Sequence, residues 1–146
     1  DALPHPLIIC AVPSSATSTT ARQLPHARVP AETVLLSCAK GIEKDSGDRL
    51  SQVLREIFPK NPIAVLSGPN LAEEIARDLA TCAVIGSEDA ELAVRIQELF
   101  TLPHFRSYTS DDLIGIEFGG AVKNVYAIAA GIIMSVLAFR LKKHAA

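Results

Sequence analysis

The stretch VLLSCAKG at residues 34–41 decides the fold, because a short run of apolar and small residues ends at a lysine and a glycine. Hydrophobicity that continues without alternation predicts a strand buried on both faces, here over residues 34–39. Similar runs at residues 7–12, 63–66 and 82–86 predict three more strands. Together the runs indicate a sheet that is covered on both sides.

Helix-like segments separate the predicted strands. The clearest spans residues 45–58, where the apolar residues fall on one helical face, and residues 92–100 repeat the pattern. This alternation predicts parallel strands joined by right-handed crossovers, which is the doubly wound α/β arrangement. The carboxyl ends of such strands form the ligand-binding edge. That edge would bring together Pro13-Ser14, Lys40-Gly41 and Ser67-Gly68-Pro69.

The pattern changes after Ser110, where no further strand is predicted and a long helix rich in glycine and alanine begins. We place a domain boundary there, between residues 1–110 and 111–146. The apolar run at residues 125–139 precedes basic residues, which raises a membrane anchor as an alternative. The run is shorter than the roughly 20 apolar residues of a membrane span, so a helix in the core of a helical domain is favoured.

Composition narrows the functional class. The 146-residue chain is 49% hydrophobic and 21% charged, with a formal net charge of -2, which gives no general attraction for nucleic acid. Cys10, Cys38 and Cys82 lie in apolar runs without metal-ligand spacing, so we interpret them as small buried residues of a cytoplasmic protein. The first residues lack the pattern of a secretory signal, and no export is expected.

Lys40 follows directly on the strand predicted at residues 34–39, where the sheet opens. Its ammonium group suits an anionic ligand, and the alternative is a lysine that extends from a strand end into water. Gly41 favours the ligand, because glycine allows the backbone to approach it closely. In SGPNLAE at residues 67–73, Asn70 and Glu73 have the spacing of a helix cap, which competes with anion binding by backbone N–H groups. Spacing alone favours the cap.

Two glycines precede Lys123 in the predicted helix, in the sequence GGAVKN at residues 119–124. Each glycine costs about 1 kcal/mol relative to alanine in a helix, so a compensating role is expected. Gly119 and Gly120 would clear the surface that the lysine side chain crosses and leave room for a ligand. Close packing of the helix on a neighbour is the alternative. Asn124 adds a neutral donor and acceptor.

Four motifs together resemble the NAD(P)-dependent glycerol-3-phosphate dehydrogenases, and their order and spacing also match. They are AKG at residues 39–41, LSGPNLAEEIA at 66–76, FRSYTSDDLIGIE at 105–117 and GGAVKNVYAIAAGI at 119–132. The resemblance implies a partial Rossmann-like, doubly wound α/β domain followed by a long helix from an all-α substrate domain. It also implies interconversion of dihydroxyacetone phosphate and sn-glycerol 3-phosphate with NAD or NADP, which supplies glycerol 3-phosphate for phospholipid synthesis.

The resemblance also implies roles for individual residues. Lys123 corresponds to the proton donor or acceptor, and Lys40 to a contact with both substrate and cofactor. The other substrate positions correspond to Gly68, Asn70 and Asn124, and the other cofactor positions to Pro13, Ser14 and Ala72. Many relatives carry Ser or Thr where this chain has Asn70. Two ammonium groups at one small site are expected to lower each other's pKa, which favours proton transfer near neutral pH.

The glycine-rich dinucleotide fingerprint of the family is absent from these residues, and residues 133–146 depart from its pattern. We therefore expect part of a longer enzyme, with weak cofactor binding and little catalysis by this chain alone. A homodimer is expected only for the full-length enzyme, and NAD and NADP stay open. Two alternatives remain: a related β-hydroxyacid dehydrogenase, and a non-catalytic remnant that binds a partner through its apolar helix.

Overall fold

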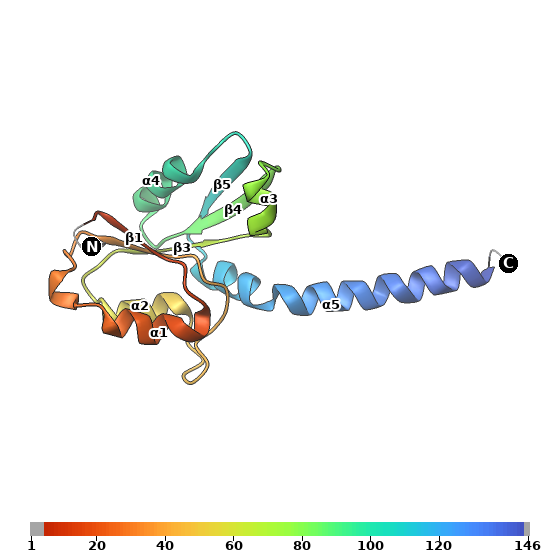
Figure 1. The fold of residues 1–146 in the computed structure, drawn as a ribbon, viewed down its shortest axis with the longest axis horizontal. Coiled ribbons are helices and arrows are strands. Elements are labelled where there is room, and N and C mark those ends of the chain that lie inside the picture. The colour runs from red at the N-terminus through yellow and green to blue at the C-terminus, as the bar shows by residue number, and fades with distance from the viewer. Residues whose placement is uncertain (1–4, 145–146) are drawn as a thin grey trace.

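The sheet has five strands in the order β1-β2-β3-β4-β5, and helices lie on both of its faces (Figure 1). The computed structural model describes residues 5–144. The strands are β1 (Leu7–Cys10), β2 (Val34–Ser37), β3 (Ile63–Ser67), β4 (Thr81–Gly86) and β5 (Phe105–Ser110). The helices are α1 (Ser14–Gln23), the short 3-10 helix η1 (His26–Arg28), α2 (Leu50–Ile57), α3 (Ala72–Ala76), α4 (Ala90–Phe100) and α5 (Leu113–His144).

Two hydrophobic clusters fill the space on either side of the sheet. On one side α1 and α2 pack over Leu35 and Ile63, and on the other side α4 packs over Leu36 and Ile85. Strand β2 is buried at every position, and Leu36 is 0% exposed. Neither face of β2 meets water, which explains the uninterrupted hydrophobic run in the sequence. The α/β class and the four predicted strands are confirmed.

Strand β4 runs antiparallel to β3, so the prediction of parallel strands throughout is wrong at this pair. Strands β1, β2 and β3 are parallel to one another, and β5 is parallel to β4. The physical reason lies in α3, which has 5 residues and buries none of them. A parallel connection needs a crossover helix that covers the sheet, and α3 is too short and too exposed for that role. The chain instead turns back beside β3.

Strand β5 was not predicted from the sequence. Three of its residues FRSYTS are exposed and only Ser107 is buried, so it lacks the continuous hydrophobic run of the other strands. It pairs with β4 from Thr81↔Phe105 to Gly86↔Ser110, and α4 forms the crossover between the two. Gln97 of α4 donates a hydrogen bond to the carbonyl oxygen of Ser107 at 2.6 Å. This contact occupies one backbone group of an edge strand that has no further neighbour in the described sheet.

Helix α2 begins at Leu50 rather than at the predicted residue 45. The Glu43 carboxylate accepts hydrogen bonds from the backbone N–H groups of Asp45 and Ser46, at 3.2 and 3.0 Å. Gly47 then adopts a positive φ of 76°. Such local bonds offer the backbone an alternative to the helix, and the helix therefore begins only after this turn.

Helix α5 packs on the sheet over its first turns and then projects away from it (Figure 1). Leu113 is buried, whereas Val125 and Phe139 are 65% and 72% exposed. By length and composition, Leu113–Arg140 qualifies as a membrane-crossing helix, with a mean hydropathy of 1.8 over 18 residues. Helices in the core of a helical domain are also long and apolar, so this feature does not distinguish the predicted core helix from a membrane anchor. The domain boundary near Ser110, between β5 and α5, stays a prediction.

Candidate functional site

The carboxyl ends of β1, β2 and β3 meet at one edge of the sheet, because these three strands are parallel. Gly41, just after β2, has a φ of 142°, and a Cβ atom there would lie 2.6 Å from the Ser14 hydroxyl. Only glycine fits this conformation and this approach without strain. The predicted turns at Pro13-Ser14 and Lys40-Gly41 are therefore in direct contact.

The Lys40 side chain reaches from the end of β2 to the loop that follows β3. Its Nζ atom donates hydrogen bonds to the Gly68 carbonyl oxygen at 2.8 Å and to the Asn70 Oδ1 atom at 3.0 Å. A longer contact of 3.5 Å joins Nζ to the Asn70 carbonyl oxygen. The structure thus holds Lys40 against the loop, which contradicts the alternative of a lysine extended into water.

Asn70 does not cap a helix, so that prediction is wrong. Helix α3 has its N-cap at Leu71 and no side-chain cap. The Asn70 amide instead accepts from Lys40 and donates to the Cys82 carbonyl oxygen at 3.5 Å. A hydrogen bond from an ammonium group is stronger than one from a neutral backbone N–H, so Lys40 takes the oxygen that a cap would use.

The environment of Lys40 changes its acidity. Burial lowers the pKa of the Lys40 ammonium group from its ordinary value of 10.5, and the positive charge of Lys123 lowers that pKa further. Desolvation and a nearby like charge both disfavour the protonated form. For Lys40, the structure supports the expected direction of the pKa shift, with burial as the larger cause.

Helix α5 crosses this edge with its glycines. A Cβ atom on Gly120 would lie 2.6 Å from the Ser67 hydroxyl and 3.7 Å from Cγ of Lys40, whereas one on Gly119 would have open space around it. Each of the two expected roles of these glycines, close packing and clear surface for a ligand, therefore fits one of them. Gly120 serves close packing of α5 on β3, and Gly119 leaves clear surface next to it.

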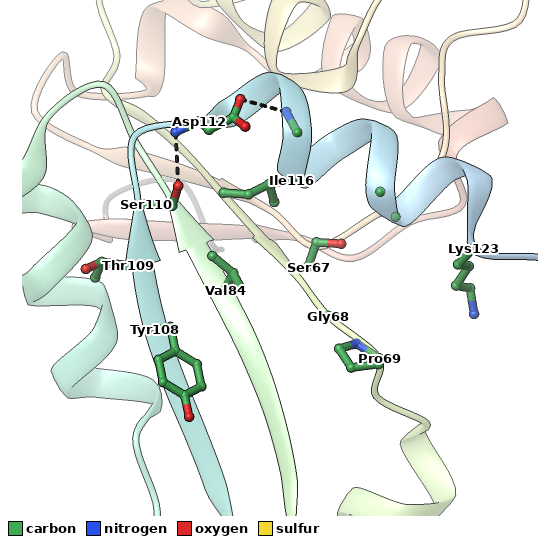
Figure 2. A pocket seen from close by; sticks show the side chains of 13 residues that line it. Ser67, Gly68, Pro69, Val84, Tyr108, Thr109, Ser110, Asp112, Ile116 and Lys123 are labelled. Carbon is green, nitrogen blue, oxygen red and sulfur yellow. Dashed lines mark hydrogen bonds between the residues drawn. The ribbon is translucent and has the colours of Figure 1, made fainter. Parts of the chain in front are cut away.

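A cavity of about 680 Å³ lies between the first turns of α5 and the strands β3, β4 and β5 (Figure 2). Ser67, Val84 and Tyr108 line its strand side, while Ile116 and Lys123 project from the helix. Lys123 is exposed and, within the part of the chain that the structure describes, has no hydrogen-bond or ion-pair partner. An unpartnered ammonium group at the rim of a cavity is available to a ligand.

The structure places the other predicted site residues as follows. Gly68 lines the cavity, whereas Asn70 does not line it and accepts a hydrogen bond from Lys40. Asn124 is exposed on α5 and is not among the residues that line the cavity. Ala72 is exposed as the first residue of α3. Lys40, Gly68, Asn70 and Lys123 are thus brought together at one end of the sheet, and Pro13-Ser14 adjoins them through Gly41.

Glu117 is a site neighbour that the sequence analysis missed. Its carboxylate accepts hydrogen bonds from Arg49, at 2.8 Å, and from the backbone and hydroxyl of Ser51, at 2.9 and 2.6 Å. Its side chain is only 8% exposed. The available signal was a single acid in the otherwise uncharged segment LIGIEFGGAV, because a charge in such a segment requires a partner.

The three cysteines are free thiols, each of them half-buried. Burial raises the pKa of the Cys10 thiol. It also raises the pKa of Cys38 to about 11, with a smaller contribution from Cys10. Thiols with raised pKa values are poor nucleophiles, so neither of these two is a candidate for covalent chemistry.

Two family models match this chain, one on each side of residues 94–111. The family model described as NAD-dependent glycerol-3-phosphate dehydrogenase N-terminus matches residues 4–93, and the model of the corresponding C-terminus matches residues 112–144. The first match alone covers more than half of the chain. The helix α5, with Lys123, falls within the second match.

Individual relatives and solved structures agree with the family match. The glycerol-3-phosphate dehydrogenase [NAD(P)+] of Clostridium tetani is 47% identical over 125 residues, which are 86% of this chain and 36% of the relative. That of Mesorhizobium japonicum is 52% identical over 99 residues, covering 68% of this chain and 29% of the relative. This chain therefore spans about a third of the length of these curated relatives.

The crystal structure of glycerol-3-phosphate dehydrogenase from Coxiella burnetii matches with a TM-score of 0.75 and 36% identity, over 86% of this chain and 38% of that one. The enzyme of Saccharomyces cerevisiae matches with a TM-score of 0.76 and 26% identity, over 88% of this chain and 39% of that one. Sequence and structure thus point to the same group. The chain belongs to the NAD-dependent glycerol-3-phosphate dehydrogenase family.

Proposed function

We propose that this chain carries part of a catalytic centre that interconverts dihydroxyacetone phosphate and sn-glycerol 3-phosphate, with NAD or NADP as the hydride carrier. One observation supports the proposal above the others. Lys40 is hydrogen-bonded to Asn70 and to Gly68, a residue that lines the cavity, and Lys123 lines the same cavity from α5. Two cationic groups near one open cavity suit a phosphorylated substrate whose carbonyl oxygen gains negative charge during reduction.

The residues at the sheet edge have the chemistry to hold an anionic dinucleotide. Helix α1 begins at Ser14 without a side-chain cap, so the backbone N–H groups of Ser14 and Ser15 are available to a phosphate, whereas that of Ala16 donates to the Pro13 carbonyl oxygen. Lys40 supplies positive charge next to that turn. In the proposal Pro13, Ser14, Lys40 and Ala72 hold the cofactor, which when bound supplies or accepts the hydride.

The two lysines would have different tasks. An ammonium group has three donors, and two of those on Lys40 are engaged at 2.8 and 3.0 Å. The third points at the Asn70 carbonyl oxygen across 3.5 Å and can turn to a ligand. Lys40 is thereby a fixed positive charge, suited to orient the substrate and stabilise its developing alkoxide.

Lys123 has all its donors free within residues 5–144 and is suited to move a proton. In the reducing direction the central carbonyl carbon gains a hydride, and its oxygen takes a proton from the Lys123 ammonium group, which gives the secondary alcohol. In the reverse direction neutral Lys123 accepts that proton. Gly68, Asn70 and Asn124 complete the proposed substrate contacts.

The remaining parts of the proposal concern the whole protein. It would act as a soluble cytoplasmic enzyme and supply glycerol 3-phosphate for phospholipid synthesis, with α5 packed inside protein rather than lipid and a homodimer as the full-length form. A second candidate, a non-catalytic binding module, is favoured by the exposed apolar side chains of α5 between Val125 and Phe139.

A chimera tests the proposal. The matched 125-residue segment of the Clostridium tetani relative is replaced by the corresponding segment of this chain. We expect reduction of dihydroxyacetone phosphate with NADH or NADPH, and a fall in kcat of about 10²–10⁴ on Lys123→Met, the usual contribution of a general acid. Affinity for the cofactor should stay unchanged in that variant.

Lys60→Met is the matched control, because Lys60 is an exposed lysine that follows α2, away from the cavity. It should leave kcat and KM as they are. Full turnover by the Lys123→Met chimera would overturn the proton-transfer role. A folded chimera that binds dinucleotide but reduces no substrate, even with both lysines present, would favour the binding module.

A further inference from the structure

We propose that Glu117 is a positioning residue, which ties helix α5 to the start of α2 and thereby holds Lys123 at the cavity beside Lys40. The inference rests on the proposed function in one respect, because it is the task of Lys123 that gives the tie its purpose. Glu117 itself does not line the cavity.

Both oxygens of the Glu117 carboxylate are engaged. Oε1 accepts from the Ser51 backbone N–H at 2.9 Å, and Oε2 accepts from Arg49 Nη1 at 2.8 Å and from the Ser51 hydroxyl at 2.6 Å. Ser51 is the second residue of α2, so its N–H has no partner within its own helix. A carboxylate at this end also interacts favourably with the helix dipole. The hydrogen bonds therefore fix the orientation of the Glu117 carboxylate on α2, in addition to the attraction between the charges.

Burial distinguishes this ion pair from others in the fold. The side chains of Arg49 and Glu117 are 19% and 8% exposed. Those of Arg55 and Glu88 are 48% and 65% exposed in an ion pair of similar length. Exposed pairs are screened by solvent and contribute little, whereas a buried, fully hydrogen-bonded pair resists movement of either element.

The tie lies where it can control the position of Lys123. Gly120 follows Glu117 by about one helical turn and lies so close to Ser67 and the stem of Lys40 that an added Cβ atom would meet both. Lys123 follows by a further turn. Among the described side chains of α5, residues 113–140, Glu117 is the one that hydrogen-bonds to another helix or strand. Because the outer part of α5 is exposed, the direction of the helix depends on these first turns.

A measurable consequence concerns Lys40. Its pKa is lowered first by burial and then by the charge of Lys123. Helix α5 passes close to the Lys40 stem at Gly120, where an added Cβ atom would lie 3.7 Å from Cγ of Lys40. If α5 swings away when the tie is cut, both causes weaken together. A residue that supported only the stability of the fold would have no such effect on a lysine in another element.

The test uses the 146-residue chain with isotope-labelled lysine, and follows the pKa of Lys40 by NMR together with amide hydrogen exchange. In Glu117→Ala we expect the pKa of Lys40 to rise toward 10.5. Exchange in residues 113–123 should accelerate about tenfold or more, while β2 and β3 keep their protection. Glu117→Gln, which retains acceptor oxygen but no charge, should lie between the wild type and the alanine variant.

Glu88→Ala is the matched control, because it removes an exposed carboxylate that pairs with Arg55 of α2. It should change neither the pKa of Lys40 nor the exchange of α5. An unchanged Lys40 pKa in a folded Glu117→Ala chain would overturn the inference. If that chain does not fold, Ser51→Ala decides, since it removes one of the three bonds, and an unchanged Lys40 pKa there would have the same meaning.

These readouts do not depend on turnover, so they fail or succeed separately from the proposed function. In an active chimera Glu117→Gln should lower kcat with little change in KM, because Lys123 is displaced while the substrate-orienting Lys40 remains. A fall in kcat together with an equally large rise in KM would indicate damage to the whole site and would contradict a positioning role.

Discussion

Replacing Gly120 by alanine tests whether α5 is packed against β3 as closely as the structure indicates. The new Cβ atom would lie 2.6 Å from the Ser67 hydroxyl and 3.7 Å from Cγ of Lys40. Ser67 is only 9% exposed, so its hydroxyl has little room to move away. Overpacking of this kind costs about 1–3 kcal/mol.

Gly119→Ala is the control in the same helix, because nothing lies within 4 Å of its added Cβ. Alanine is preferred to glycine in a helix by about 1 kcal/mol, and both variants gain this amount. We therefore expect Gly119→Ala to raise the free energy of unfolding by about 1 kcal/mol. The free energy of unfolding of the Gly120→Ala chain should be lower than that of the Gly119→Ala chain by about 1–3 kcal/mol, which is the cost of overpacking.

Urea unfolding followed by circular dichroism measures both values, and Ser67→Ala identifies the cause. Removing the hydroxyl should allow Gly120→Ala to fit, which gives a coupling energy of about 1 kcal/mol or more in the double-mutant cycle. Equal stabilisation by Gly119→Ala and Gly120→Ala, or a cycle without coupling, would refute close packing at Gly120.

Three further predictions concern Lys40, Asn70 and Cys38. Because the pKa of Lys40 is lower in the folded chain than its ordinary 10.5, the unfolded chain binds more protons between these two values, and stability should rise with pH across that window. Lys40→Met should flatten this rise in urea titrations, and Lys123→Met should raise the pKa of Lys40 only in part, since burial is the larger cause. Asn70→Ala removes a charge-assisted acceptor and should lower the free energy of unfolding by about 1–2 kcal/mol, and an unchanged urea midpoint would contradict the observed contact. With a pKa of about 11 against the ordinary 9.0, Cys38 should react with iodoacetamide at pH 8 roughly 100-fold more slowly in the folded chain than in urea, and equal rates would contradict its burial.

The sequence predicted elements whose physical cause is local and strong. Strand β2 is covered on both faces, and a strand buried in this way requires an unbroken apolar run, which is visible in the sequence. Strand β5 is an edge strand with exposed positions at Arg106 and Tyr108, so its sequence carries no comparable signal. The direction of β4 depended on whether α3 could cross the sheet, which is a matter of packing rather than of any single residue.

The candidate site shows the same division. The turn at Lys40-Gly41 followed from strand logic, because a lysine and a glycine ended a buried run. The role of Asn70 was mispredicted, since the spacing to Glu73 is a local signal and the competing contact with Lys40 is 30 residues away. The partner of Glu117 lies 66 residues away at Ser51 and could not be found from spacing in the chain. Long-range hydrogen bonds of this kind emerge only with the fold.

The length of α5 gives the anchored first turns a mechanical consequence. Lys123 stands only four residues beyond Gly119, whereas Phe139 stands about 30 Å along the axis, at 1.5 Å per residue. A tilt of about 10° at Gly119 would move Lys123 by roughly 1 Å and the region of Phe139 by roughly 5 Å, on the same geometry. The helix is therefore a lever with its fulcrum at the sheet edge. A partner that bound the outer part of the helix and moved it would therefore shift Lys123 by about one fifth of that displacement.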